Sequence, residues 1–90
     1  MMNIKYHNKF KKDLKILKKR KFDMTLLKNV IVMLANNETL PEKYSNHSLT
    51  GSLKGYMDCH IQNDWVLIYK IDKEISLLSL YHTGTHSDLF

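Results

Sequence analysis

The sequence predicts an α+β fold in which two N-terminal helices pack on an antiparallel sheet of three to four strands. Hydrophobic residues recur with the period of a helix up to about residue 36, and with the two-residue period of a strand from residue 55 to residue 82. Helices followed by a run of strands are typical of α+β domains. The 90 residues, 43% of them hydrophobic, supply one small core and not two, so residues 1–90 are expected to form a single domain.

The first elements are a short strand and an amphipathic helix. Residues 2–6 alternate in polarity and are expected to form the strand. The helix is expected to begin at Asn8, a plausible N-cap, and to end near Arg20. Its apolar residues Phe10, Leu14 and Leu17 follow helical spacing, and Lys11, Lys15 and Lys18 form another face.

A second helix and a long loop complete the N-terminal half. Asp23 is a good N-cap, and Asn36, Asn37 and Pro41 end the pattern. The buried stripe is expected to consist of Leu27, Val30, Ile31 and Leu34. Residues 37–54 are polar and rich in turn-forming residues, which indicates a loop.

Three strands are expected in the C-terminal half: Gly55–Gln62, Trp65–Ile71 and Glu74–His82. Their connections, Asn63-Asp64 and Asp72-Lys73, are short enough for hairpins, which predicts an antiparallel meander. In the first strand Met57, Cys59 and Ile61 lie on one side, and Tyr56, Asp58 and His60 on the other. In the third, Ile75, Leu77, Ser79 and Tyr81 oppose Ser76, Leu78, Leu80 and His82.

The positive charge is concentrated at the N-terminus. The net charge is +5, and nine of the 14 Lys and Arg residues lie in residues 1–22, where Asp13 is the only acid. Such a field suits a polyanionic partner, because phosphates release counterions on binding; a solvated helix face is the alternative. No apolar run is long enough to span a bilayer, and the single Cys59 agrees with a reducing compartment, so a cytoplasmic protein without a membrane partner is expected.

Histidine is the residue type most able to carry chemistry here, since it takes and gives protons near neutral pH. Four of the five histidines lie in the second half: His47, His60, His82 and His86. The expected meander brings the end of the first strand, Asp64, and the end of the third strand to one edge of the sheet. Strand order decides whether these groups converge. Asp64 is placed to orient an imidazole.

Other chemistry is less favoured. Cys59, His60, His82 and His86 are nominal metal ligands, but no CxxC or HExxH motif is present, so neither a metal nor a cofactor is expected. Cys59 alternates onto the apolar side and is expected to be a buried hydrophobe rather than a nucleophile. Phe90 either docks into the core or lies under a splayed RNA base.

Four separated motifs resemble the YafQ branch of the RelE-like type II toxins. They are His47-Ser48-Leu49-Thr50-Gly51, Leu53-Lys54-Gly55-Tyr56, His60-x-x-x-Asp64-Trp65-Val66-Leu67-Ile68-Tyr69 and Thr83-Gly84-Thr85-His86-Ser87-x-Leu89-Phe90. The helical half fits the same pattern at Lys12-Asp13, Phe22-Asp23 and Leu40-Pro41. The resemblance therefore covers essentially the whole chain, as a RelE/YafQ-like toxin domain with a microbial-RNase-like fold.

The resemblance implies a ribosome-dependent mRNA endoribonuclease restrained by a cognate antitoxin, which we expect to be acidic. The family's active-site positions fall on His47, His60, Asp64, Trp65, His86 and Phe90. This chain departs at one position: His82 stands where relatives usually carry an arginine, which removes a permanent charge from the place where the phosphate binds.

Metal-free RNA cleavage needs only a base near the 2′-hydroxyl, an acid near the leaving 5′-oxygen and positive groups around the phosphate. We expect His86 to be the acid, His47 or His60 the base, and Asp64 an orienting carboxylate. Trp65, His82, Phe90 and the lysines at 11, 15 and 18 are expected to contact mRNA or ribosomal RNA. The alternatives are a non-catalytic nucleic-acid-binding module and a catalytically decayed toxin homologue, the latter suggested by His82.

Overall fold

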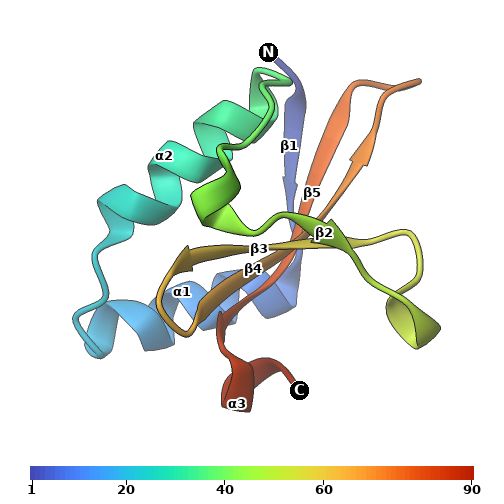
Figure 1. Ribbon diagram of the computed structural model, residues 1–90. Helices are drawn as coiled ribbons and strands as arrows, with labels where there is room; N and C mark the ends of the chain where they lie inside the picture. Colours follow the sequence, from blue (N-terminus) through green and yellow to red (C-terminus); the bar gives the residue numbers. More distant parts are fainter.

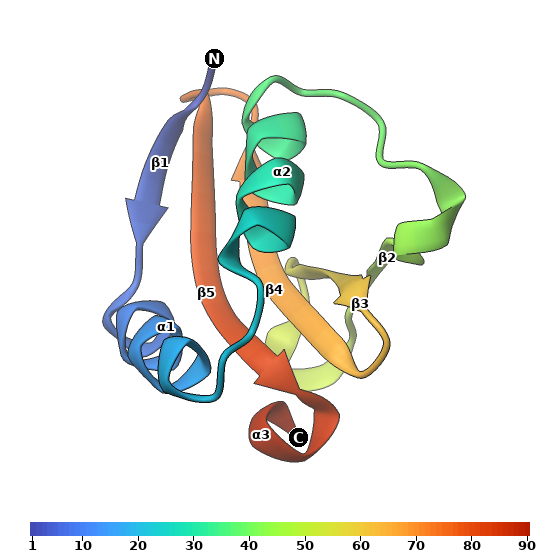
Figure 2. The same cartoon turned by 90° about the vertical axis from the view of Figure 1, so that its left-hand side faces the viewer.

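Five strands form one mixed sheet in the order β1-β5-β4-β3-β2 in the computed structural model, which describes all residues 1–90 (Figures 1 and 2). The strands are β1 (Asn3–Tyr6), β2 (His47–Ser48), β3 (Met57–Gln62), β4 (Trp65–Asp72) and β5 (Leu77–Thr85). The helices are α1 (Asn8–Lys19), α2 (Met24–Ala35) and α3 (His86–Leu89), and two 3₁₀ turns are η1 (Glu42–Tyr44) and η2 (Gly51–Leu53). No helix has the length and apolar composition needed to cross a membrane.

The predicted antiparallel meander is confirmed as β3-β4-β5, and the strand expected at residues 2–6 is confirmed as β1. The number of strands is corrected from three or four to five. β1 pairs with β5 in parallel, so the sheet is mixed. β2 pairs with β3 inside the segment expected to be only a loop. Alternation of polarity predicts that a strand forms but not which partner it finds. A parallel neighbour requires a long connection, and the chain between β1 and β5 contains both main helices and three strands.

The limits of β5 differ from the prediction at both ends. The strand begins at Leu77 rather than Glu74, because residues 73–76 form a turn in which Ser76 has φ of 52°. It continues past His82 to Thr85, which pairs with Trp65. The sheet therefore carries the Thr-Gly-Thr segment directly to the start of α3.

A bulge in β5 changes the face on which its last residues lie. Tyr69 pairs with Leu80, whereas the preceding residue Ile68 pairs with His82, so Tyr81 is the extra residue. Leu80 lies on the core side of the sheet, and His82 lies on the opposite side together with Ile68. The predicted shared face of Leu80 and His82 is thus wrong, because a bulge inserts one residue and inverts the alternation.

The helix caps agree with the prediction at one of two sites. The side chain of Asp23 accepts a hydrogen bond from the Thr25 N–H at 3.0 Å and caps α2. Asn8 is already the first residue of α1, and His7 occupies the N-cap without a side-chain bond. His7 instead places its ring edge against Tyr81, with 5.6 Å between ring centroids.

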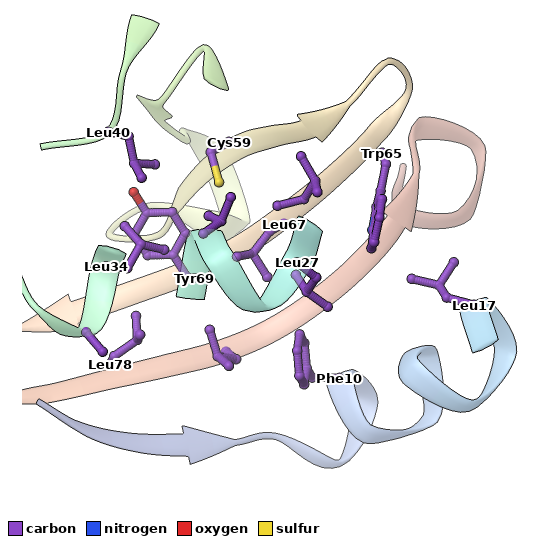
Figure 3. Close-up of a cluster of buried hydrophobic side chains, with 14 residues drawn as sticks. Phe10, Leu17, Leu27, Leu34, Leu40, Cys59, Trp65, Leu67, Tyr69 and Leu78 are labelled. Atoms are coloured by element: carbon purple, nitrogen blue, oxygen red, sulfur yellow. The ribbon is translucent and has the colours of Figure 1, made fainter. Parts of the chain in front are cut away.

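One face of the sheet is covered by α2, and α1 packs beside β5 beyond the end of β1 (Figures 1 and 2). Figure 3 shows the resulting core, in which side chains from both helices meet those of β3, β4 and β5. Its members include Phe10, Leu17, Leu27, Val30, Leu34, Cys59, Leu67, Tyr69, Leu78 and Leu80. Cys59 is a buried free thiol, as expected.

No main helix covers the opposite face of β3, β4 and β5, which we call the open face (Figure 1). Val66 and Ile68 of β4 are buried there. Their cross-strand partners on the same face are His60, Gly84, Asp58 and His82. The open face therefore brings together residues from three strands that sequence alone left unplaced.

A single carboxylate joins α1 to the edge of β5. β1 ends opposite Leu80, which leaves the next part of the β5 edge without a strand partner. Asp13 fills this gap: its Oδ2 accepts a hydrogen bond from the Thr83 N–H at 2.9 Å and also contacts His82 Nδ1. An edge N–H that would otherwise lack a partner is thereby satisfied.

Replacement of Asp13 by alanine is expected to destabilise the protein by roughly 1–3 kcal/mol, because the partly buried Thr83 N–H and His82 lose their shared acceptor. The measurement is the urea midpoint of unfolding. Asp13→Asn retains an oxygen acceptor and should recover much of the loss, and Lys12→Ala, on the exposed side, should change little. An unchanged midpoint for Asp13→Ala would contradict this role.

Candidate active site

His60, His86 and Asp64 meet where the β3-β4 turn lies against the start of α3. The rings of His60 and His86 are 5.3 Å apart, edge to face. Asp64 Oδ1 contacts His86 Nδ1 and also accepts the His86 backbone N–H at 3.2 Å. A carboxylate can only accept, so Nδ1 carries the hydrogen and Nε2 of His86 is left free to hold or release a proton.

The same two hydrogen bonds act on Asp64. The side chain of His86, followed by its backbone N–H, lowers the pKa of Asp64 below its ordinary value. Asp64 therefore remains ionised throughout the neutral range and keeps the His86 ring in one orientation. The imidazole that Asp64 contacts is that of His86, 22 residues away, rather than that of His60 in its own hairpin.

His47 and Asp58 form a second pair on the open face. His47 lies on β2 opposite Asp58 in the β2-β3 register, and its Nε2 is 2.9 Å from Asp58 Oδ1. The other nitrogen, Nδ1, donates to the Ser45 carbonyl at 2.9 Å, since a carbonyl oxygen only accepts. Two acceptors cannot face each other favourably, so the pair needs a proton, either on Nε2 or on Asp58.

Asp58 is the most deeply buried acid of the site, with 4% of its surface exposed. Burial raises its pKa, and the charges of His47, His60 and His86 act in the opposite direction. His47 contacts this carboxyl group, His60 lies two residues away on the same side of β3, and His86 packs against His60. The imidazoles at 47, 60 and 86 share one region of the open face.

His82 is held differently from the other three. Its Nδ1 contacts Asp13 of α1, and both side chains are mostly buried. The pair comprises one acid and one imidazole, so it supplies no net positive charge even when His82 is protonated. Any contact of His82 with a phosphate has to use its second ring nitrogen.

Trp65 lies beneath the site rather than in it. It is 3% exposed, its Nε1–H donates to Thr83 Oγ1 at 2.9 Å, and Phe22 packs edge-on against it. An indole in this position fixes the β4-β5 pairing that carries Asp64 and His86. An open pocket of about 450 Å³ lies beyond it, between residues 20–23 and residues 62–65.

The short helix α3 fixes His86 and Phe90 relative to the sheet. Thr85 and Asp88 form a reciprocal capping box, and Arg20, the C-cap residue of α1, forms a 2.9 Å ion pair with Asp88. A Cβ at Gly84 would lie 2.9 Å from Asp88 Oδ2, so only glycine fits beside this cap. Phe90 is 63% exposed, with its ring 6.1 Å from that of His86, so it does not dock into the core.

The basic helix has two functionally different sides. Lys9, Asp13 and Arg20 contact Tyr81, Thr83 and Asp88 respectively, so they face β5 and α3. Lys11, Lys15 and Lys18 are exposed, and their helical positions turn them away from that side. No three His, Cys, Asp or Glu residues are grouped so as to hold a metal ion.

Comparison with known proteins identifies the family. The family model described as "Bacterial toxin of type II toxin-antitoxin system, YafQ" matches residues 2–90. The chain belongs to the YafQ family. Among YafQ proteins, the mRNA interferase toxin YafQ of Escherichia coli (strain K12) is 45% identical over 89 residues, which cover 98% of this chain and 95% of the relative.

Solved structures of YafQ-like toxins share the fold. The metal-bound toxin from Helicobacter pylori has a TM-score of 0.93 and 44% identity, with both chains fully covered. The toxin in the E. coli DinJ-YafQ toxin-antitoxin complex has a TM-score of 0.89 and 43% identity, covering 99% of this chain and 97% of that one. The family resemblance and the α+β fold predicted from sequence are both confirmed.

Sequence reasoning about this YafQ-family chain missed Asp58. The alternation of Tyr56, Asp58 and His60 had placed them on one side of a strand, and that signal is correct. Nothing in the pattern indicated that β2 would form and bring His47 onto Asp58.

Asp58→Asn is expected to be more stable than the wild type at pH 8, by a few degrees in Tm. Burial raises the pKa of Asp58, so its contribution to stability is present below the ordinary carboxyl pKa and is lost as the pH rises through the raised value. The difference should therefore vanish below about pH 4. Thermal unfolding followed across this range by circular dichroism measures it.

Asp64→Asn is the control, for which the opposite change in stability at pH 8 is expected. Its pKa is lowered, so its contribution is present at neutral pH and is lost as the pH falls through the lowered value. This variant should be slightly less stable than the wild type at pH 8. A destabilised Asp58→Asn at that pH would show that the charged form of Asp58 is favoured by the fold.

Proposed function

We propose that residues 1–90 act as one toxin domain of a type II toxin-antitoxin pair, an mRNA interferase that cleaves mRNA at the ribosome by histidine acid-base chemistry without a metal. The observation that carries the proposal is the gathering of His47, His60 and His86 in one region, where His47 contacts Asp58 and His86 packs against His60. The E. coli relative, named an mRNA interferase toxin, supports the same activity.

The chemistry uses the nucleophile that RNA itself contains. A base takes the proton of the 2′-hydroxyl, the 2′-oxygen attacks phosphorus, and the bond from phosphorus to the 5′-oxygen breaks. An acid gives a proton to that leaving oxygen, so the products are a 2′,3′-cyclic phosphate and a 5′-hydroxyl. Hydrolysis of the cyclic product then gives a 3′-phosphate.

His86 is suited to be the acid. Asp64 holds its Nδ1, so the free Nε2 carries the transferable proton. Phe90, exposed beside His86, is placed to support the base of the nucleotide being cut.

Of the two candidate bases, His60 has the better geometry. It lies 5.3 Å from His86, ring to ring, and no hydrogen bond occupies its ring nitrogens. His47 has partners at both nitrogens, Ser45 and Asp58. We therefore assign His60 as the base and His47, whose ring is held between Ser45 and Asp58, as a positioning residue at the edge of the site.

The exposed lysines of α1 are proposed to place the toxin on ribosomal RNA and on the mRNA backbone. Lys11, Lys15 and Lys18 lie away from the histidines, so they serve binding rather than cleavage. Phosphate contacts position a protein without choosing a sequence. Because the proposed substrate is mRNA on translating ribosomes, the toxin is proposed to act in the cytoplasm.

We propose that a cognate antitoxin protein binds the toxin and inhibits it. The E. coli relative is bound by DinJ in a toxin-antitoxin complex. The net charge of +5, concentrated on α1, favours an acidic antitoxin segment.

His86→Ala is expected to lower the rate of mRNA cleavage by about a hundred- to ten-thousand-fold without unfolding the domain, because it removes one proton-transfer group. Primer extension maps the breaks in mRNA, with translating ribosomes present and absent. Ser87→Ala, the neighbouring exposed residue, should stay within a factor of about two of the wild type.

The same assay separates the rival functions. A folded His86→Ala variant with full activity would exclude His86 as the acid. Wild-type protein that binds RNA and ribosomes but never yields a cut product would indicate a non-catalytic binding module or a decayed toxin.

Neutralising Lys11, Lys15 and Lys18 together is expected to weaken ribosome binding and to lower the slope of log affinity against log salt by about 2 to 3, roughly one for each lost phosphate contact. The single-turnover rate at saturating toxin should not change, since these lysines do not contact the histidines. Lys28, Lys43 and Lys73, neutralised together, form the control with the same change in charge. An equal effect of both triples would show that only net charge matters.

A further inference from the structure

A cluster of aromatic and cationic side chains occupies the part of the open face that the proposed mechanism does not use. Tyr56 and Tyr81 lie with ring centroids 5.1 Å apart and planes tilted by 43°. His7 packs edge-on against Tyr81. Both tyrosines are half-buried, so part of each ring faces solvent.

The register of the sheet places this cluster in line with the histidines. Tyr56 directly precedes β3, two residues before Asp58 and four before His60, and residues at even spacing share a face. Four strand residues span about 13 Å. Tyr81 is the bulged residue of β5, adjacent to His82. The tyrosine pair therefore lies on the same surface as the proposed cleavage site, at the other end of β3.

Two lysines flank the pair. Lys9 Nζ of α1 is 5.2 Å from the centroid of the Tyr81 ring, and Lys70 Nζ of β4 is 5.6 Å from that of Tyr56. Both lysines are exposed. The Tyr81 hydroxyl accepts one long contact of 3.5 Å from Lys9, and the Tyr56 hydroxyl has no partner within the protein. The cluster thus offers aromatic surface, the unpaired hydroxyl group of Tyr56 and two lysine charges that have no acidic partner.

We propose that Tyr56 and Tyr81 form a subsite that stacks a base of the mRNA strand flanking the cut phosphate, with Lys9 and Lys70 contacting the adjacent backbone. The inference rests on the proposed function, because the strand has to continue beyond the histidines. Proteins bind single-stranded RNA by this combination, since every base has a face that stacks on an aromatic ring and every nucleotide carries a phosphate.

The alternative is that the tyrosines only shield the apolar side chains of β4. Ile68 is buried on the open face and needs cover. Leucine at position 81 would give the same cover without an aromatic face, and phenylalanine would keep the aromatic face without the hydroxyl. This pair of substitutions separates shielding from stacking.

The experiment combines protein variants with removal of single bases. Ribosomes carry an mRNA in which one nucleotide at a time, within three positions on either side of the cut, is abasic. The toxin concentration that gives half-maximal cleavage is measured for the wild type, Tyr81→Leu and Tyr81→Phe. Tyr6→Leu is the matched control, an exposed tyrosine on β1 that pairs with Leu80 and packs on Phe10, and so lies on the helix-covered face rather than on the open face.

One abasic position is expected to raise the half-maximal concentration for the wild type by about 5- to 100-fold. Tyr81→Leu should raise it similarly on intact mRNA, and the same abasic position should then have no further effect. Tyr81→Phe and Tyr6→Leu should stay within a factor of about two. The cleavage rate at saturation should be unchanged in all of them.

Three outcomes would overturn the subsite. The first is an unchanged half-maximal concentration for Tyr81→Leu. The second is that the effects of Tyr81→Leu and of an abasic nucleotide multiply at every position, so that the two changes act independently. The third is that Tyr81→Leu weakens antitoxin binding and leaves cleavage of mRNA unchanged. If circular dichroism shows that Tyr81→Leu is unfolded, Tyr56→Leu replaces it in the same set of measurements. If the wild type cuts no mRNA, the proposed function fails, and the subsite is judged by fluorescence anisotropy with the same RNAs.

Discussion

The open face of the sheet is organised by three pairs of one aspartate and one histidine: Asp13 with His82, Asp58 with His47, and Asp64 with His86. Each aspartate belongs to a different element, namely α1, β3 and the β3-β4 turn. Each pair also joins residues that are distant in sequence. The site consequently exists only when the whole fold is formed, and the fold itself needs one of the pairs to close the edge of β5.

The three pairs differ in burial, and burial distinguishes their roles. The side chains of His82 and Asp13 are 15% and 13% exposed, whereas those of His86 and Asp64 are 49% and 58% exposed. A buried pair broken on one side leaves an uncompensated polar group, so its main effect is structural. An exposed pair costs little to form and leaves a ring nitrogen accessible to substrate. The His47-Asp58 pair combines both properties, since the histidine is exposed and the aspartate is buried.

Much of the fold and the position of several site residues follow from local sequence. The alternation in β3 and β4, the stripe of α2 and the Asp23 cap depend on neighbouring residues, and they are predicted correctly. The bulge at Tyr81 and the contacts of Asp13 and Asp58 depend on pairings formed across the chain, for which a period carries no signal. The family motifs indicate the proposed catalytic positions, but the partner of each histidine appears only when the strands are in register.

The histidine at position 82 strengthens the argument that the tyrosine cluster binds RNA. The family resemblance implies an arginine there, a permanent cation near the phosphate, and this chain has instead a histidine paired with Asp13. The pair is at most neutral, so positive charge along this part of β5 has to come from neighbours. Lys9, on the same side of α1 as Asp13, lies against Tyr81 next to His82. In the proposed subsite, Lys9, one helical turn from Asp13, supplies this positive charge and combines it with the aromatic surface of Tyr81.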